Sequence, residues 1–157
     1  MKKLIINTLF AAFAAVALCA GSVGCSGGKS KSPKPLGEQA IDFVYGLAHN
    51  DPKVDDFLAP DHYVSISGRQ WDKDGEYWDG NTFPPETLSA LAALPRESYQ
   101  VTSAYGMMGR TEISVQASTE ENAEYVRIVL YFGEGSKIVS CKGHMDGFSV
   151  DVYQHGR

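Results

Sequence analysis

Alternation of apolar and polar residues between positions 99 and 153 is the feature that most limits the folds open to this chain. The strongest run is Tyr125 to Phe132, which is rich in Val, Ile, Leu and Tyr and therefore predicts a strand. Similar runs cover 99–105, 112–117, 138–141 and 148–153, with turn-forming residues between them. Because pairs such as Asp146-Gly147 join antiparallel neighbours, this half of the chain predicts an antiparallel meander.

The preceding part of the chain has mostly helical spacing. Leu36 to Asn50 places its apolar residues on one helix face, and Asp51-Pro52 begins a second, shorter helix that stops by Asp61. His62 to Ser67 alternates as a first strand, and Asn81 to Leu94 predicts a third helix. Helices followed by a meander indicate an α+β domain, in which the helices pack on one face of a curved antiparallel sheet.

The segment LGEQAIDFVYGLAHNDPKVDDFLAPDHYVSIS, residues 36 to 67, resembles the opening of NTF2-like domains, also called cystatin-like cone domains. The similarity extends in element order to about residue 145 and implies a cone whose mouth holds a pocket. Ketosteroid isomerase, an enzyme with this fold, has a catalytic tyrosine at the position that Phe43 occupies here. Its general base corresponds to Ser65 or Ile66, so this resemblance does not extend to that chemistry.

The N-terminus reads as an export signal. Lys2 and Lys3 precede an apolar stretch from Leu4 to Leu18, which is shorter than the roughly 20 residues of a membrane span. Residues 20–25, AGSVGC, resemble the lipobox of bacterial lipoproteins, which implies cleavage of residues 1–24 and lipidation of Cys25. Two alternatives remain: a short anchor that stays attached, or an ordinary signal peptidase that cuts at the same bond.

Residues 25–35 are predicted to be a flexible tether between the lipidated cysteine and a single domain over 36–157. Acyl chains on Cys25 would hold the protein on a membrane, and the lysines of the tether favour anionic head groups. The residue after Cys25 is Ser26 rather than Asp. If the source is a diderm bacterium, lipoprotein sorting rules therefore predict attachment to the outer membrane, facing the periplasm. The expected location is thus the cell envelope.

Charge and cysteine usage narrow the function further. Loss of residues 1–24 removes two lysines, and 12 basic residues against 19 acidic ones give a net charge of −7. Phosphate contacts need clustered Lys and Arg, so nucleic-acid binding is not expected.

After loss of residues 1–24 and lipidation of Cys25, Cys141 is left as a lone cysteine and is predicted to be buried. If Cys25 is not lipidated, a Cys25–Cys141 disulfide becomes the alternative.

The segment from Trp71 to Gly80 gathers acids and aromatic residues between the first strand and the third helix. Its candidate binding residues are Trp71, Asp72, Asp74, Glu76, Tyr77 and Trp78. Three spaced carboxylates suggest a calcium loop, but an EF-hand needs Gly and Glu where this chain has Tyr77 and Phe83, so no metal is predicted. Either the aromatic residues anchor a ligand or partner, or Trp71 and Trp78 simply cover the core.

No catalytic motif, paired metal-binding histidines or cofactor fingerprint occurs in the sequence, so no cofactor and no catalytic residue is assigned. The leading hypothesis is a non-catalytic lipoprotein domain that binds an envelope protein or a small ligand. One alternative is a small NTF2-like enzyme that uses Asp61, His62 or Tyr63 at a pocket rim. Another is a carbohydrate- or peptidoglycan-associated module that uses Trp71 and Trp78.

Overall fold

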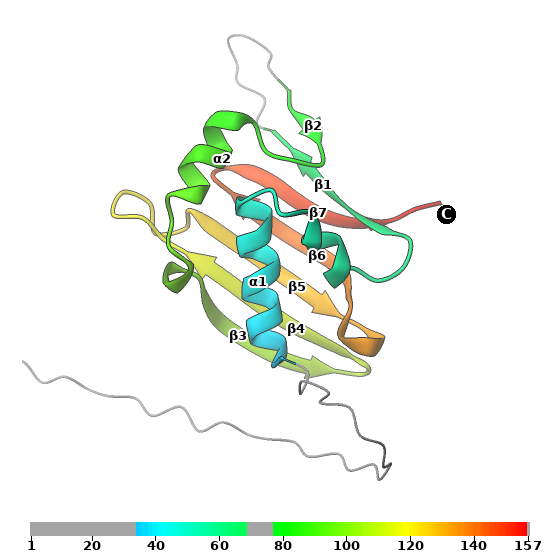
Figure 1. The fold of residues 1–157 in the computed structure, drawn as a ribbon. Coiled ribbons are helices and arrows are strands. Elements are labelled where there is room, and N and C mark those ends of the chain that lie inside the picture. Colours follow the sequence, from blue (N-terminus) through cyan, green and yellow to red (C-terminus); the bar gives the residue numbers. More distant parts are fainter. Residues whose placement is uncertain (1–33, 69–76, 157) are drawn as a thin grey trace, which may run out of the picture. The chain divides into compact units, whose positions relative to one another are not determined.

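A single antiparallel sheet dominates the computed structural model, which describes residues 34–68 and 77–156. Within these residues seven strands are ordered β2-β1-β7-β6-β5-β4-β3 (Figure 1). The strands are β1 (His62–Ser67), β2 (Asp79–Gly80), β3 (Gln100–Met107), β4 (Arg110–Ala117), β5 (Val126–Phe132), β6 (Ile138–Met145) and β7 (Phe148–Gln154). The helices are α1 (Leu36–Ala48) and α2 (Pro85–Ala92), with short 3-10 turns η1 (Pro52–Phe57), η2 (Arg96–Ser98) and η3 (Glu134–Ser136). The predicted α+β class is confirmed.

Most predicted elements are present, with instructive differences at their ends. The strand predicted over 62–67 is confirmed at both ends, whereas the helix predicted over 81–94 shortens to α2. Phe83 precedes Pro84, and a residue before proline is driven out of helical geometry, so α2 begins only at Pro85. The strand predicted over 138–141 continues to Met145 because both β5 and β7 pair with it. The two-residue β2 was not predicted.

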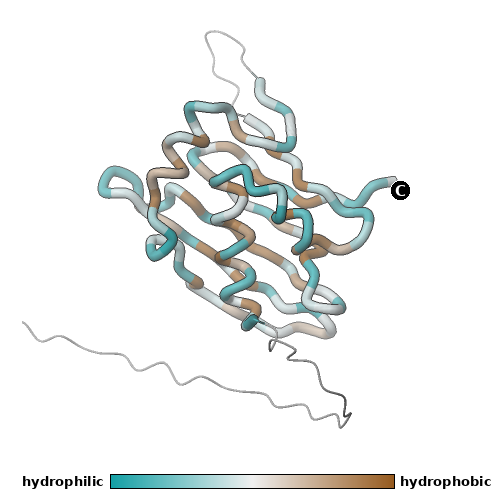
Figure 2. Tube along the Cα trace, viewed as in Figure 1, coloured by the Kyte–Doolittle hydropathy of each residue, from teal (hydrophilic) through white to brown (hydrophobic). Residues whose placement is uncertain are grey.

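The core lies between α1 and one face of the sheet. Ala40, Phe43, Val44, Leu47 and Ala48 recur at helical spacing and are buried, which places one face of α1 on the strands. Apolar segments follow the strands beneath this helix in Figure 2. The strand residues on this face are fully or nearly fully buried: Val64, Ile66, Ile113, Val115, Ala117, Val126, Ile128, Leu130, Phe132, Cys141, Met145, Val150 and Val152. Phe43 and Ile66, at the positions compared with ketosteroid isomerase, are thus core residues.

The opposite face of the sheet, called here the open face, carries the alternate residues of each strand. These side chains are half-buried or exposed, as expected when an antiparallel sheet packs on one side only. Tyr63 and Tyr153 lie at its β1–β7 side, while Tyr105 and Tyr131 lie toward β3. None of the helices in the described residues is long and apolar enough to span a bilayer.

Candidate binding site

An aromatic cluster lies on the open face where β1 meets β7. Tyr63 and Tyr153 are directly paired across these strands, with ring centroids 6.0 Å apart. His155, just beyond β7, stacks on Tyr63 with centroids 4.3 Å apart and an interplanar angle of 28°. The Tyr153 side chain is 51% exposed, so the cluster presents aromatic surface to solvent rather than to the core.

Local strand geometry explains why these rings meet. Val64 and Val152 point into the core, so their neighbours Tyr63 and Tyr153 must point to the open face. The His155 backbone N–H donates to the Asp61 carbonyl at 2.6 Å, which continues the pairing past the end of the strand. The chain is therefore held at the position that stacks the His155 ring on Tyr63.

Tyr77 is an exposed aromatic residue in the loop before β2. The Asp151 carboxylate raises the pKa of Tyr153, with smaller contributions from burial and from the Tyr63 and Tyr77 phenols. Tyr77 is 58% exposed. The aromatic cluster is defined by its ring contacts as Tyr63, Tyr153 and His155.

The Trp78 side chain packs against the segment that follows β2. Its indole Nε1–H donates to the Thr82 carbonyl at 2.8 Å, and its ring lies against Gly80. The side chain is 37% exposed, so Trp78 does not belong to the buried core. The other candidate residues of this segment, Trp71, Asp72, Asp74 and Glu76, lie outside the described residues.

A surface cleft of about 430 Å³ adjoins the aromatic cluster and shares Tyr63 and His155 with it. Its other lining residues come from the end of α1, from η1 and β1, and from the segment after β2: Leu47, Asn50, Asp51, Pro52, Val54, Asp55, His62, Val64, Asn81 and Thr82. His62, named in the enzyme alternative, has Nδ1 2.8 Å from the Pro60 carbonyl. The Asp51 carboxylate accepts the Lys53 backbone N–H as the cap of η1. These two groups serve local structure, which leaves Tyr63 and His155 as the residues that the cleft and the aromatic cluster share.

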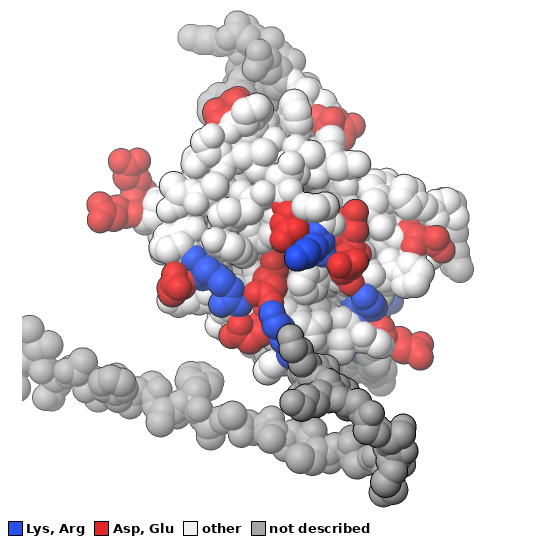
Figure 3. All heavy atoms as spheres, in the orientation of Figure 1, with Lys and Arg blue, Asp and Glu red and all other residues white. Residues whose placement is uncertain are grey.

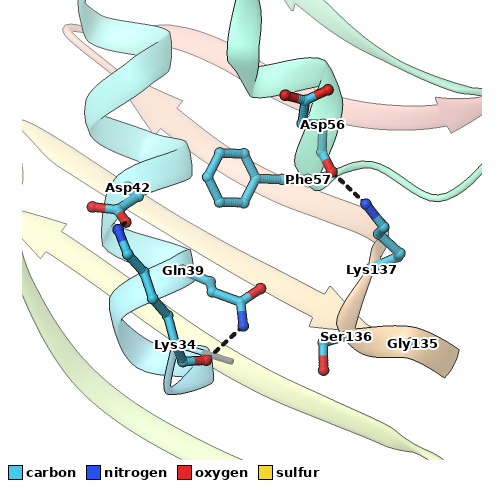
Figure 4. Close-up of a pocket in the computed structure, with 8 residues that line it drawn as sticks. All are labelled: Lys34, Gln39, Asp42, Asp56, Phe57, Gly135, Ser136 and Lys137. Carbon is cyan, nitrogen blue, oxygen red and sulfur yellow. Dashed lines mark hydrogen bonds and ion pairs between the residues drawn. The ribbon is translucent and has the colours of Figure 1, made fainter. Parts of the chain in front are cut away.

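A second cleft, of about 450 Å³, lies between α1, η1 and η3 (Figure 4). Basic and acidic side chains meet over this part of α1 (Figure 3). Lys34 Nζ pairs with the Asp42 carboxylate at 2.8 Å, and Lys137 Nζ donates to the Asp56 carbonyl. Because both ammonium groups bind acceptors of the chain itself, this cleft is the weaker candidate for a charged ligand.

Groups suited to metal binding or nucleophilic chemistry do not converge on either cleft. Within residues 34–68 and 77–156, no three His, Cys, Asp or Glu side chains are grouped to hold a metal ion. Cys141 is buried as predicted, with Sγ 3.5 Å from the Val150 carbonyl oxygen, and burial raises the pKa of its thiol. A buried thiol with a raised pKa is a poor nucleophile. Cys25 lies outside the described residues.

Comparison with models of known protein families finds no match for this chain, and comparison with curated proteins finds none either. The candidate site therefore rests on geometry alone.

Sequence reasoning identified Tyr77 but missed Tyr153 and His155 as partners of Tyr63. The sequence did hold one signal: in their alternating strands, Tyr63 and Tyr153 both occupy positions that face away from the core. The pairing of β1 with β7 brings them together, and that pairing joins the two ends of the domain's sequence.

Proposed function

We propose that this chain is an envelope lipoprotein, held on a membrane by lipid on Cys25, whose domain is a non-catalytic binding module. The aromatic cluster and its adjoining cleft are the proposed contact surface for a protein partner or a small ligand. The leader supports the anchor, since a basic start and a short apolar core precede a lipobox-like cysteine.

The exposed position of the aromatic cluster is the observation that carries the binding proposal. Tyr rings provide a large contact area at low entropic cost and keep a polar group for hydrogen bonding, so they are enriched at binding surfaces. Here they lie beside one another on a rigid sheet and flank an open cleft. Such a surface needs little ordering before it binds a ligand.

We further propose that the domain is a divergent NTF2-like cone. The order of a helix, a short helical turn, a strand, a helix and a meander supports this assignment. The space between α1 and the sheet is filled by side chains such as Phe43 and Leu130. Ligands are therefore expected at the surface clefts rather than inside a deep cone, which disfavours the enzyme alternative.

A saccharide is the second candidate ligand class. It is favoured by the Asp151 carboxylate, which lies near Tyr153 on the open face. Sugars present apolar ring faces that stack on aromatic side chains and hydroxyls that donate to carboxylates. Peptidoglycan is an envelope polymer with this chemistry. Tyr63 and Tyr153 join Trp78 as candidate stacking residues, and Trp71 lies outside the described residues.

The anchor is tested by fractionation and intact mass of the mature protein beside a Cys25→Ala variant. Diacyl or triacyl mass on Cys25, with the variant absent from membranes, is the expected result. A soluble protein with Cys25 bonded to Cys141 would overturn the anchor.

The binding surface is tested with purified peptidoglycan and with photocrosslinking from position 77 in envelope preparations. Tyr153→Ala is expected to reduce capture at least several-fold, because it removes the most exposed ring of the β1–β7 pair. Tyr105→Ala is the matched control, since Tyr105 is equally exposed on the same face but lies on β3. Equal loss in both variants, or in neither, would contradict a role for the aromatic cluster.

A further inference from the structure

The β3–β4 hairpin exposes two methionines at its tip, defined here as Met107 to Arg110. Met107 is 68% exposed and Met108 is fully exposed. Large apolar side chains at a protruding turn are costly to leave in water, and a contiguous exposed group of them often marks a contact surface. The two methionines are therefore a candidate contact surface.

The geometry of the turn keeps these side chains outward. Met107 pairs with Arg110, so Met108 and Gly109 alone form the bend, and Gly109 has φ 78°. Strand β3 is an edge strand whose residues are almost all exposed, so nothing in the described chain folds over the tip. A shallow cleft of about 300 Å³ beside it is lined by Met107, Met108, Arg110, Glu112 and Tyr131.

The tip lies at the end of the domain where the chain enters it. Thr111, next to the tip, pairs with Phe132, so the tip and the η3 turn lie at the same end of β4 and β5. Ser136 of η3 and Lys34, just before α1, line one cleft. Figure 1 shows the start of α1, η3 and the β3–β4 hairpin along the same lower edge of the domain.

The length of chain before this edge limits its distance from the anchor. Lys34 is nine positions after Cys25. An extended chain spans at most about 3.6 Å per residue, so Lys34 lies within about 30 Å of a lipidated cysteine. The edge that carries the methionines is thus the edge that the tether holds near the bilayer.

We propose that the hairpin tip contacts the lipid bilayer that holds the anchor, an inference that rests on the proposed lipidation of Cys25. Met107 and Met108 insert their flexible apolar side chains among the head groups. The exposed Arg110 guanidinium, directly opposite Met107, pairs with lipid phosphate. Because the tether makes this contact intramolecular, a weak interaction is sufficient to orient the domain.

The charge at the two ends of the sheet agrees with this orientation. The edge near the tether carries charges of both signs: Lys34, Arg110 and Lys137 lie there together with Glu38, Glu112 and Glu134. The loop over 118–125, at the other end of β4 and β5, contains Glu120, Glu121 and Glu124 and no basic residue. Acidic side chains are visible on this projecting loop in Figure 3. Anionic lipid therefore repels this wholly acidic loop more strongly than the edge of mixed charge near the tether, where Arg110 is exposed.

Methionine oxidation measures this contact directly. The mature protein is anchored in vesicles of phosphatidylethanolamine and phosphatidylglycerol and treated with chloramine-T, an anionic oxidant, and sulfoxide is quantified at each methionine. Met107 and Met108 are expected to oxidise several-fold more slowly than in the free Cys25→Ala protein. Met145 is buried, so its rate is expected to be equal in both and serves as the internal control.

A variant pair separates a specific contact from general shielding. In Met108→Asp, protection of Met107 is expected to disappear, while Ala123→Asp, which adds the same charge to the exposed 118–125 loop, retains it. Equal oxidation of Met107 on and off vesicles, or protection that persists in Met108→Asp, overturns the proposal. Protection that rises with the surface density of the protein assigns the tip to a second copy. Protection found only in native envelopes assigns it to a protein partner.

Intact mass and methionine oxidation test the lipid anchor and the tip contact separately. If intact mass shows that Cys25 carries no lipid, the proposed lipoprotein is wrong. The tip is then tested after the Cys25 thiol is coupled to a maleimide lipid in the same vesicles, because Cys141 is buried and does not compete. Unprotected methionines in that arrangement refute the tip contact independently.

Discussion

At the scale of single residues, Tyr99 carries a hydroxyl that the packing does not satisfy. The side chain is 3% exposed, its ring lies edge-on to Tyr45 with centroids 5.6 Å apart, and its hydroxyl has no hydrogen-bond partner among the described residues. Burial is also the main cause of the raised pKa of this phenol. Burying an unpaired hydroxyl costs about 1–3 kcal/mol. The ring of Tyr99 therefore stabilises the fold, whereas its hydroxyl destabilises it.

Tyr99→Phe is therefore expected to keep the ring contacts and raise the free energy of unfolding by about 1 kcal/mol. Urea titration followed by far-UV circular dichroism measures this change. Tyr153→Phe is the control, because that residue is 51% exposed and removal of its hydroxyl is expected to be neutral. A clear loss of stability in Tyr99→Phe would mean that a bound water satisfies the hydroxyl.

Arg96 ties η2 to α1 through two carboxylates. Its guanidinium donates to Asp42 from Nε at 3.2 Å and from a terminal nitrogen at 2.7 Å, and to Glu38 at 2.7 Å. Partial burial acts to raise the pKa of the Asp42 carboxyl, but hydrogen bonds from Lys34 and Arg96 outweigh it, so the pKa is lowered. A lowered pKa means that Asp42 stabilises the fold most when it is ionised.

Arg96→Gln is expected to lower the free energy of unfolding by about 1 kcal/mol at neutral pH, a value that allows for the solvent exposure of the guanidinium. The deficit should persist above the unfolded pKa of Asp, about 3.9, and shrink as the pH falls through the lower folded pKa. Denaturation of both proteins between neutral and strongly acidic pH measures it. Arg127→Gln, which breaks only the exposed pair with Glu124, should show a smaller deficit. A deficit that grows in acid would contradict the ion-pair account.

At the scale of elements, Gly143 allows β6 to lie close against β5. A Cβ at this position would be 2.1 Å from the Arg127 carbonyl oxygen and 2.6 Å from the Ile128 Cα. Backbone atoms cannot yield as a flexible side chain can. Any larger residue must therefore separate the two central strands locally.

Gly143→Ala is expected to lower the free energy of unfolding by about 3 kcal/mol, at the upper end of overpacking costs. Chemical denaturation measures the loss. Gly106→Ala on β3 is the matched control, because its Cβ would meet open space, and a change of less than about 1 kcal/mol is expected. Similar effects at both positions would show that strand propensity, rather than the close approach, determines the cost.

At the scale of the whole molecule, the Cys141 thiol reports on cooperative opening of the sheet. It is buried in the core on strand β6, which is paired on both sides. A maleimide reagent reaches such a thiol only when the core opens, so labelling should be far slower than in urea-unfolded protein. Its dependence on urea should match that of global unfolding. Fast labelling without denaturant would indicate local opening of β6 and β7, and the absence of any thiol in denatured protein would indicate a disulfide to Cys25.

Local patterns determined much of the secondary structure by themselves. The alternation from His62 to Ser67 predicted β1 to the residue, and Asp146-Gly147 correctly predicted the turn between β6 and β7. The spacing of Ala40, Val44 and Leu47 identified the buried face of α1. These features depend on neighbours within a few positions, so they can be read from the sequence without knowing the rest of the fold.

Only the tertiary structure decided which distant residues meet and which face of the sheet remains open. Tyr63 stacks on His155, and Arg96 reaches Asp42, because strand order and helix placement bring remote segments together. The exposure of Met108 likewise depends on β3 being an edge strand that no helix covers. An apolar residue at a turn has the same local pattern whether it is buried or exposed. Its exposure follows from what packs over it, which local alternation does not encode.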